Sequence, residues 1–554
     1  NRGLHLLSFY SRFHHTAKTA LTLQCLRKYL PVFLCLLLPL IFASAPSNAQ
    51  SLAFKQAVAE LAVNNKKLAQ FYEVTGYAPL WVGKSKLHRI RRNAFFKAIS
   101  AADIHGLPVR RYGPKILKKQ ANAARTQEDL AAIEVLMSRT FLTYASDIQT
   151  GLLVPKKISA DIKRKVPYRD HFSYLKNFAK SNPAAFLKAL PPTHPEYARL
   201  MREKLRFEKI VVRNTWGAPL ELAQLKPGDT GKQVVQLRNR LMAMGYLKRN
   251  LHRKYDTKLQ GAVTAFQIDH GLNPDGFAGP ATLSELNTPA KRRLQSIIVA
   301  MERIRWSNKD LGDRHVLVNL TDFTAKIIQN DKVTFRTRSV VGANMDSRRT
   351  PEFSDIMELM VINPTWHVPR SISVTEYLPV LQEDPMALEH LILYDDFGLQ
   401  VNRAMHDFNM YDEQNFPFDI KQMPSPGNAL GLVKFLFPNP HNIYLHDTPE
   451  KSLFSKDRRT FSHGCIRLQQ PFEFAYNLLK TQEQWPEDFF KAQLTTGMEI
   501  SVNLVEPVPV HLIYRTATVP ADGRINFRSD IYGRDLQIWQ ALAGQGVALQ
   551  PVRG

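Results

Sequence analysis

The 554-residue chain is strongly basic, with 74 Lys and Arg residues against 49 Asp and Glu residues and a net charge of +25. Its length excludes a single hydrophobic core, because chains beyond roughly 250–300 residues divide into domains. A surface of this charge usually faces an anionic partner such as nucleic acid, acidic lipid or an acidic wall polymer, with a merely soluble basic surface as the alternative.

Residues 1–49 have the order of a secretory signal. They hold five basic and no acidic residues, and the sixteen-residue apolar run LPVFLCLLLPLIFASA extends from Leu30 to Ala45. A membrane-spanning helix needs about twenty apolar residues, so the pattern favours a cleaved export signal, with an uncleaved membrane anchor as the alternative. We therefore expect the protein in the periplasm or cell envelope, where nucleic acid is not a partner. Without these residues the chain still has 69 basic and 49 acidic residues.

Residues 50–220 are expected to form a helical scaffold domain. Apolar residues recur at three- and four-residue steps in Ser51–Tyr72, Arg92–Ala102, Glu128–Ser146 and Tyr197–Lys209, which is the spacing of amphipathic helices. Pro and Gly residues separate these stretches. No histidine cluster or carboxylate pair here has a spacing typical of a catalytic site, so we assign no chemistry to this region.

Residues 221–290 predict a compact unit of three helices. Asp229 or Thr230 can cap the first helix, and Gly245 and Gly271 can end the first and the second. The motifs GDTGKQVVQLRNRL and AFQIDHGLNPDGFAGPATL in this unit resemble the peptidoglycan-binding-like domain family. The resemblance implies attachment to the cell wall, with a spacer that does not bind as the alternative.

From His315 the hydrophobic period changes from helical to two, so residues 315–510 are expected to form a mostly β domain with a first hairpin at Asn330-Asp331. A helical and irregular stretch at 371–422 interrupts the strands and is expected to act as a capping lid. The remaining segments are a helical connector that returns to the scaffold, residues 291–314, and C-terminal strands with a short helix that complete the fold, residues 511–554. The fold class is therefore multidomain α+β.

Cys465 is the only cysteine after residue 49. Exported proteins normally pair their cysteines, so a leftover thiol is a dimer link, a buried apolar residue or a nucleophile. A metal site is not expected, because no second thiolate or closely spaced histidine pair accompanies Cys465. The residues around it favour the nucleophile.

A thiol attacks as thiolate and is mostly protonated at neutral pH, so Cys465 needs a base. His446 lies in the predicted strand NIYLHD, where Tyr444 and His446 point to the same face. His463 is the rival base, although two residues within one tight turn rarely let an imidazole reach back to the thiol. Gly464 has no side chain where a substrate carbonyl would approach backbone N–H groups.

The motif HDTP, followed fifteen residues later by SHGCIRL, resembles the signature of the L,D-transpeptidase catalytic domain, a family of cysteine enzymes that remodel bacterial peptidoglycan. The stretches NPTWHVPRSI, SPGNALGLVKF and VGANMDSRRTPEF are also similar to this family. AMERIRW before the sheet and DIYGRD after it resemble the large subgroup with a helical scaffold and an inserted capping subdomain. The resemblance covers essentially everything after residue 50.

The resemblance implies a role for each matching residue. Cys465 is the nucleophile and His446 its base, and the oxyanion or orienting positions are Ser462, His463, Gly464 and Asp447. Whether the Asp447 carboxylate or a backbone carbonyl orients the imidazole stays open. Substrate contacts are expected from Arg467, Tyr444, Trp366 and Asn428, with a surface charge, plain core and a turn former as the alternatives for Arg467, Trp366 and Asn428.

The implied reaction is a two-step acyl transfer that forms 3→3 cross-links between diaminopimelate residues of stem peptides through a cysteine thioester. It needs no cofactor or metal, and carbapenem-type β-lactams should react with the same thiol. Other wall synthesis enzymes are candidate partners. The alternatives are an L,D-carboxypeptidase or wall-protein attachment and release by the same acyl-enzyme, and, from another class, a non-catalytic wall-binding scaffold.

Overall fold

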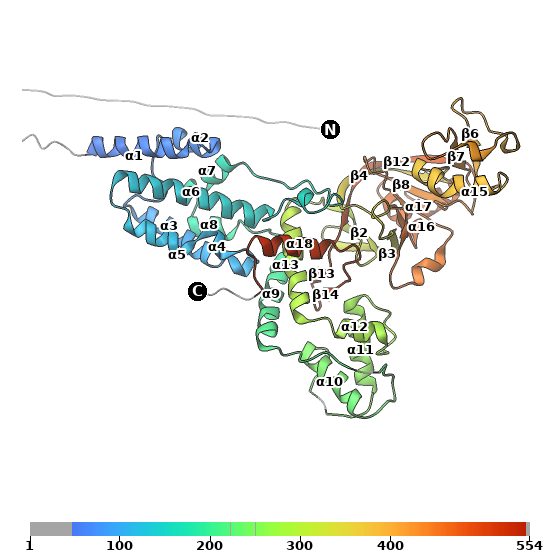
Figure 1. Cartoon of the computed structure of the whole chain (residues 1–554), viewed down its shortest axis with the longest axis horizontal. Coiled ribbons are helices and arrows are strands. Elements are labelled where there is room, and N and C mark those ends of the chain that lie inside the picture. The colour runs from blue at the N-terminus through green and yellow to red at the C-terminus, as the bar shows by residue number, and fades with distance from the viewer. Residues whose placement is uncertain (1–46, 222, 250, 550–554) are drawn as a thin grey trace, which may run out of the picture. The chain divides into compact units, whose positions relative to one another are not determined.

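The computed structural model describes residues 47–221, 223–249 and 251–549 (Figure 1). It has a helical N-terminal region, a small three-helix unit and a mostly β C-terminal domain, which confirms the expected fold class. The predicted signal peptide lies, up to residue 46, outside the described residues. Within the described ranges, no helix combines the length and the apolarity that a membrane crossing requires.

The scaffold region is built around a cluster of aromatic side chains. Trp81, Phe95, Phe141 and Phe178 are fully buried, and their neighbouring ring centroids lie 4.6 to 5.9 Å apart. The helices of this region are α1 (Ser47–Ala62), α2 (Lys66–Val74), α3 (Lys86–Ser100), α4 (Val109–Tyr112), α5 (Pro114–Ala123), α6 (Gln127–Thr150), α7 (His171–Lys180), α8 (Pro183–Lys188) and α9 (Pro195–Arg213), with short 3₁₀ turns at Ala102–His105 and Pro155–Lys157.

The helical pattern of Ser51–Tyr72 is divided between two helices in the structure. Asn65 lies between α1 and α2 with an extended backbone, and its side chain accepts a hydrogen bond from the N–H of Leu68. This is the geometry of an N-cap, which ends one helix and starts the next. The apolar spacing continues across the break and therefore concealed it.

The three-helix unit consists of α10 (Lys232–Met244), α11 (Thr257–His270) and α12 (Pro280–Leu286). Gly245 and Gly271 end α10 and α11 in the left-handed conformation, as predicted. The predicted cap of α10 was wrong, because Gly231 occupies the N-cap position without a side-chain bond. The Asp229 carboxylate accepts a hydrogen bond from the N–H of Lys226 instead.

Helix α13 (Ala290–Trp306) is the predicted connector and is buried over its last ten residues. It packs in one core with α9 and the C-terminal helix α18 (Arg534–Gly544). Arg303 of α13 forms buried ion pairs with Glu352 and with Asp535. These pairs join the connector to the β domain and to the C-terminal segment.

The β domain is built on a nine-stranded sheet. Its strands are β1 (Arg314–Asn319), β2 (Thr324–Gln329), β3 (Lys332–Gly342), β4 (Phe353–Ile362), β8 (Val433–Leu436), β9 (Leu445–His446), β10 (Thr460–Ser462), β11 (Ile466–Leu468) and β12 (Ile500–Ile513). Their order is β10-β3-β11-β9-β8-β4-β12-β1-β2. Helices α16 (Pro471–Leu479) and α17 (Pro486–Leu494) pack into the sheet's core. The predicted hairpin at Asn330-Asp331 is confirmed, with positive φ at both residues.

Strand β12 crosses the domain boundary that we expected between residues 510 and 511, so that boundary was wrong. Glu506–Pro509 contains two prolines, which normally interrupt a central strand. The pairing of β12 with β4 shifts register between Asn503 and Val508, and the strand then continues to Ile513. Such an irregularity accommodates residues that cannot donate to the ladder. The short strands β13 (Ala517–Thr518) and β14 (Asn526–Phe527) follow as a separate pair.

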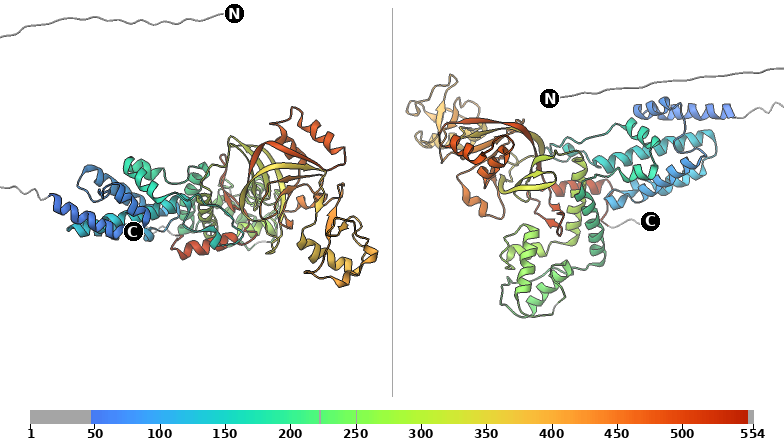
Figure 2. Two further views of the ribbon diagram at one scale, coloured as in Figure 1. Left: turned by 90° about the horizontal axis from the view of Figure 1, so that it is seen from above. Right: turned by 180° about the vertical axis from the view of Figure 1, so that it is seen from behind.

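The insertion expected at 371–422 begins earlier, at Trp366, and contains a small sheet that the helical and irregular prediction missed. Its strands are β5 (Trp366–His367), β6 (Ile392–Tyr394) and β7 (Asp419–Gln422), in the order β5-β7-β6. Its helical turns are α14 (Arg370–Ile372), η3 (Ser373–Tyr377), α15 (Leu378–Glu383), η4 (Arg403–Met405) and η5 (Phe408–Met410). Strands of two to four residues are too short to show a period-two pattern. The insertion has a core of its own and extends beside the large sheet (Figure 2).

Candidate active site

Two adjacent strands bring four predicted site residues onto one face of the sheet. Strand β9 pairs in parallel with β11, with Leu445 opposite Ile466 and His446 opposite Arg467. Leu445 and Ile466 are fully buried in the sheet's core. Because side chains alternate along a strand, His446 and Arg467 lie on the other face. Tyr444 directly precedes Leu445 and Cys465 directly precedes Ile466, so Tyr444 and Cys465 lie on the same face as His446 and Arg467.

Cys465 is half-buried, and its Sγ donates to the carbonyl of Asn442 at 3.4 Å. Burial raises the pKa of the thiol to about 11, while hydrogen bonds from Tyr444 and the charge of Arg467 act in the opposite direction. The thiol is therefore protonated at neutral pH in the resting protein.

His446 is buried, and its Nδ1 has no hydrogen-bond partner among the described residues. Burial and, to a smaller extent, the positive charge of Arg467 lower the pKa of the imidazole to about 3, and hydrogen bonding to the backbone of Asp447 and Leu430 acts in the opposite direction. Its ring centroid lies 5.6 Å from that of Tyr444. The resting site thus holds a neutral imidazole near a neutral thiol, in the state that a general base requires.

The buried imidazole predicts a pH dependence of stability. An unfolded histidine titrates near pH 6.5, so between pH 6.5 and 3 only the unfolded chain binds this proton, and stability falls as the pH falls. The loss is about 1.4 kcal/mol per pH unit. We expect His446→Gln to remove about 2 kcal/mol of the acid destabilisation between pH 6.5 and 5, measured by denaturant unfolding. Equal acid sensitivity of both proteins would contradict this.

The turn before Cys465 is held by its own hydrogen bonds. The Ser462 hydroxyl donates to the carbonyl of Cys465 at 2.5 Å and accepts from the N–H of Gly464 at 3.2 Å. Gly464 has a φ of +117°, and a Cβ there would lie 3.2 Å from Ile443 Cδ1, so glycine suits this position. The N–H that we expected to hold the oxyanion is thus engaged with Ser462 in the resting structure.

Thr350, for which the sequence predicted no role, fixes this turn from outside the SHGCIRL motif. Its Oγ1 donates to the carbonyl of Gly464 at 2.7 Å and accepts from the N–H of Gly342 at 2.9 Å. Thr350 is fully buried. It belongs to the stretch VGANMDSRRTPEF, so the resemblance marked the segment but not the contact.

We expect Thr350→Val to slow acylation of Cys465 by about ten- to a hundredfold, because both backbone groups lose a buried partner worth about 1–3 kcal/mol. Valine keeps the shape of the side chain, and Thr350→Ser, which keeps the hydroxyl, is the matched control. Single-turnover acylation kinetics measure the effect. A valine variant as fast as the serine variant would show that the hydroxyl does not position the turn.

His463 was the rival base and Asp447 a candidate to orient the imidazole. Both side chains instead bind groups outside the Cys465–His446 pair. His463 Nε2 lies 2.5 Å from Glu376 Oε1 of the insertion, and Glu376 also pairs with Arg348. The Asp447 carboxylate accepts from the N–H of Leu432 at 3.0 Å and pairs with Lys451 at 2.5 Å. His463 therefore ties the insertion to the nucleophile turn, and Asp447 orders a neighbouring loop.

Arg467 is half-buried, and its Nε is buried without a hydrogen-bond partner in the part of the chain that the structure describes. Burial lowers its pKa, and the charges of Glu450 and Cys465 oppose this. A buried guanidinium nitrogen without an acceptor is costly in the free protein and is suited to a carboxylate ligand.

The other predicted substrate contacts have structural partners. Trp366 is 8% exposed in the core of the insertion, in edge contact with Tyr377. Asn428 is fully buried and donates to the carbonyls of Pro364, Gln422 and Met423 at 3.1 Å. Tyr444 packs partly against the core of the insertion as well. Of these three, Tyr444 lies on the same face as the thiol.

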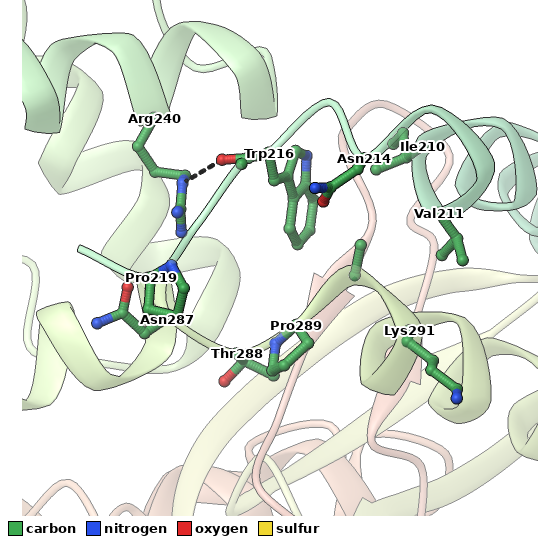
Figure 3. A pocket seen from close by; sticks show the side chains of 12 residues that line it. Ile210, Val211, Asn214, Trp216, Pro219, Arg240, Asn287, Thr288, Pro289 and Lys291 are labelled. Carbon is green, nitrogen blue, oxygen red and sulfur yellow. Dashed lines mark hydrogen bonds between the residues drawn. The ribbon is translucent and has the colours of Figure 1, made fainter.

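A separate cavity of about 180 Å³ lies between the end of α9, helix α10 and the start of α13 (Figure 3). Trp216 and Arg240 line it, and the Arg240 guanidinium donates through each of its three nitrogens to the backbone carbonyls of Trp216, Leu286 and Ala218. None of the predicted site residues lines this cavity, so it is distinct from the candidate active site.

Three family models match the described chain. Residues 66–203 match the "Scaffold domain", residues 230–286 match the "Putative peptidoglycan binding domain", and residues 313–500 match the "L,D-transpeptidase catalytic domain". The matches follow the order of the helical region, the three-helix unit and the β domain described above.

Individual relatives agree with the third match. A curated protein of Haemophilus influenzae named "Putative L,D-transpeptidase" is 32% identical over 225 residues, which are 40% of this chain and 45% of that protein. The chain thus spans less than half the length of this relative.

Two solved structures are also similar over part of the chain. An L,D-transpeptidase from Xylanimonas cellulosilytica is 16% identical, with a TM-score of 0.17, over 53% of this chain and 100% of its own. One from Stackebrandtia nassauensis is 14% identical, with a TM-score of 0.20, over 54% and 97%. Residues 313–500 are therefore similar to the L,D-transpeptidase catalytic domain family.

Proposed function

We propose that the protein is a peptidoglycan L,D-transpeptidase of the cell envelope that forms 3→3 cross-links through a thioester at Cys465. The observation that carries this proposal is the placement of Cys465, His446, Tyr444 and Arg467 on one face of two adjacent strands. The match of residues 313–500 to the catalytic domain family supports it.

The first step acylates the thiol. His446 accepts the thiol proton as the sulfur attacks the carbonyl of the diaminopimelate residue at position three of a tetrapeptide stem. The amide bond to the terminal D-alanine then breaks, His446 returns the proton to the leaving amine, and a thioester remains. In the second step the side-chain amine of another stem attacks the thioester, which forms the cross-link and regenerates the thiol.

The electrostatics of the resting site favour proton transfer during attack. Burial raises the pKa of the Cys465 thiol and lowers that of His446, so a separated thiolate–imidazolium pair is disfavoured before substrate binds. As the sulfur attacks, negative charge moves to the carbonyl oxygen, and His446 takes the proton in the same step.

The attack requires a small movement of the thiol. In the resting structure Sγ donates to the Asn442 carbonyl. Cys465 and His446 are diagonal neighbours on one face of the parallel pair β9 and β11. Rotation about the Cα–Cβ bond of Cys465 therefore changes its partner from the carbonyl to the imidazole.

The insertion is proposed to exclude water until the acceptor amine arrives. Glu376 of the insertion bonds to His463 of the nucleophile turn and to Arg348, and Tyr444 packs against the insertion's core. A thioester that must wait for an amine benefits from such closure, because water competes for the same carbonyl. Arg467 is proposed to bind a substrate carboxylate through its unpaired nitrogen.

Intact-mass spectrometry after exposure to a carbapenem tests the acyl-enzyme. We expect one adduct on the full chain and none on Cys465→Ala, because the thiol is the proposed nucleophile. An adduct on the alanine variant, or none on the intact protein, would contradict the proposal and favour a non-catalytic wall-binding scaffold.

The acceptor is identified by the products. We propose an amine acceptor, for which digested wall from cells that make the protein contains 3→3 dimers. Shortened tripeptides alone would instead assign an L,D-carboxypeptidase, and a stem linked to a protein would assign wall-protein attachment, both through the same acyl-enzyme.

A further inference from the structure

A second cavity, of about 150 Å³, lies where the scaffold region, the connector and the β domain meet, and its walls are basic. Lys163, Arg164 and Lys165 come from the scaffold region and Lys309 from the connector, while Asp355 is the single acidic residue in the lining. Among the residues that the structure describes, none of these four cations forms an ion pair with a carboxylate. The cavity therefore carries a net positive charge.

The wall that carries these cations is fixed to the β domain. Arg164 donates to Ser354 Oγ at 2.8 Å and to the carbonyl of Leu512. The backbone N–H of Lys163 donates to the carbonyl of Glu352 at 2.9 Å, and the N–H of Glu352 donates back to Asp161 at 2.8 Å. Burial lowers the pKa of Arg164 to about 10, so it remains charged at neutral pH.

Some of the residues that line the basic cavity lie at the same edge of the sheet as the nucleophile. Strand β4 is antiparallel to β8, β8 is antiparallel to β9, and β9 is parallel to β11. The start of β4, the end of β8 and the starts of β9 and β11 therefore share one edge. Phe353, Ser354 and Asp355 at the start of β4 line the cavity, and Cys465 immediately precedes β11.

One loop joins the cavity to the thiol. His441 lines the cavity, and the next residue, Asn442, offers the carbonyl that accepts the Cys465 thiol. Consecutive Cα atoms are about 3.8 Å apart, so the wall of the cavity begins within a residue's length of the resting thiol's partner. The loop His441–Asn442 therefore links the cavity wall to the resting thiol.

We propose that this basic cavity binds a carboxylate of a peptidoglycan stem peptide while another part of the same stem occupies the active site. The inference rests on the proposed function, because that function supplies a peptide with several carboxylates. A cavity of this volume accommodates a carboxyl-bearing side chain, and the desolvated Arg164 guanidinium attracts a carboxylate more strongly than an exposed one does, while the exposed Lys165 and Lys309 add positive charge. The scaffold region then supplies part of the substrate site.

Charge reversal in the full chain tests this inference. Lys165 and Lys309 are exposed, so Lys165→Glu/Lys309→Glu leaves buried contacts intact. We expect the KM for a tetrapeptide stem to rise about tenfold with kcat changed less than about twofold, because the cavity binds substrate without touching the reacting atoms. A stem whose carboxylates outside the scissile unit are amidated should show the same KM with both proteins. Lys118→Glu/Lys119→Glu on the exposed side of α5 is the matched control.

Failure of this inference is distinguishable from failure of the proposed function. An unchanged KM in an active Lys165→Glu/Lys309→Glu protein overturns the cavity assignment alone. If the intact protein turns over no stem, the dissociation constant of the tetrapeptide is measured instead. It is compared between Cys465→Ala proteins with and without the charge reversal. A dissociation constant about tenfold weaker after charge reversal supports the cavity, and equal constants overturn it.

Discussion

We expect His446→Gln to slow acylation of Cys465 by a carbapenem by about a hundred- to ten-thousandfold, the range that a positioned general base contributes. His446 is buried on the same sheet face as Cys465, and its neutral state persists because burial lowers its pKa to about 3. Glutamine retains polarity and similar size but cannot accept the proton at a comparable rate. Stopped-flow acylation under single-turnover conditions measures the loss.

The matched control is His463→Gln, because His463 is the histidine closest in sequence to the thiol. It bonds to Glu376 of the insertion, so its loss should loosen the contact between insertion and turn and slow acylation less than about tenfold. The reverse order of the two effects would assign the base to His463 and would refute the role of His446. Both variants should keep the fold, which circular dichroism verifies.

The second large effect is expected for stability. Glu352 is buried and pairs with Arg303 of α13 and with Arg534 of α18. We expect Glu352→Gln to destabilise the protein by about 3–5 kcal/mol, because removing one partner of a buried ion cluster leaves the arginines short of compensating charge. The shift of the first unfolding transition in guanidinium chloride measures the change, since a chain of several domains need not unfold in one step.

The exposed pair between Arg314 and Glu506 provides the comparison. Glu506 is 66% exposed and lies 3.9 Å from Arg314, so Glu506→Gln should change stability by less than about 1 kcal/mol. If the two substitutions cost the same, the Glu352 cluster does not hold the connector to the β domain. If Glu352→Gln is silent, Asp535 alone compensates Arg303.

Several local features of the fold were predictable from short-range chemistry. Gly245 and Gly271 end their helices and Asn330-Asp331 forms its hairpin, because each position needs a backbone conformation that few residues adopt easily. Where the prediction failed, a longer-range contact decided. Strand β12 passes through two prolines because β4 and β1 hold it on both sides, and the strands of the insertion pair although each is too short to be recognised.

The candidate active site also combines features that the sequence predicted with features that depend on long-range contacts. The order of residues around Cys465 and the alternation along NIYLHD predicted that Tyr444 and His446 share a face, and the pairing of β9 with β11 adds Cys465 and Arg467 to it. The partners of Asp447, Asn428 and the Gly464 N–H were not predictable. Each of these groups has several acceptors or donors within reach, and only the packing of distant segments selects one.

The sequence by itself determined which atoms can react, because a thiol, an imidazole and a guanidinium keep their chemistry in any fold and their spacing along two strands sets which face they share. Only the tertiary structure decided which of these groups are desolvated and which polar groups are already occupied. It also assembled the basic cavity from residues 163–165, 309 and 353–355, which are far apart in the chain. The physical reason is that burial, charge compensation and hydrogen-bond choice depend on contacts between segments, and no local pattern records them.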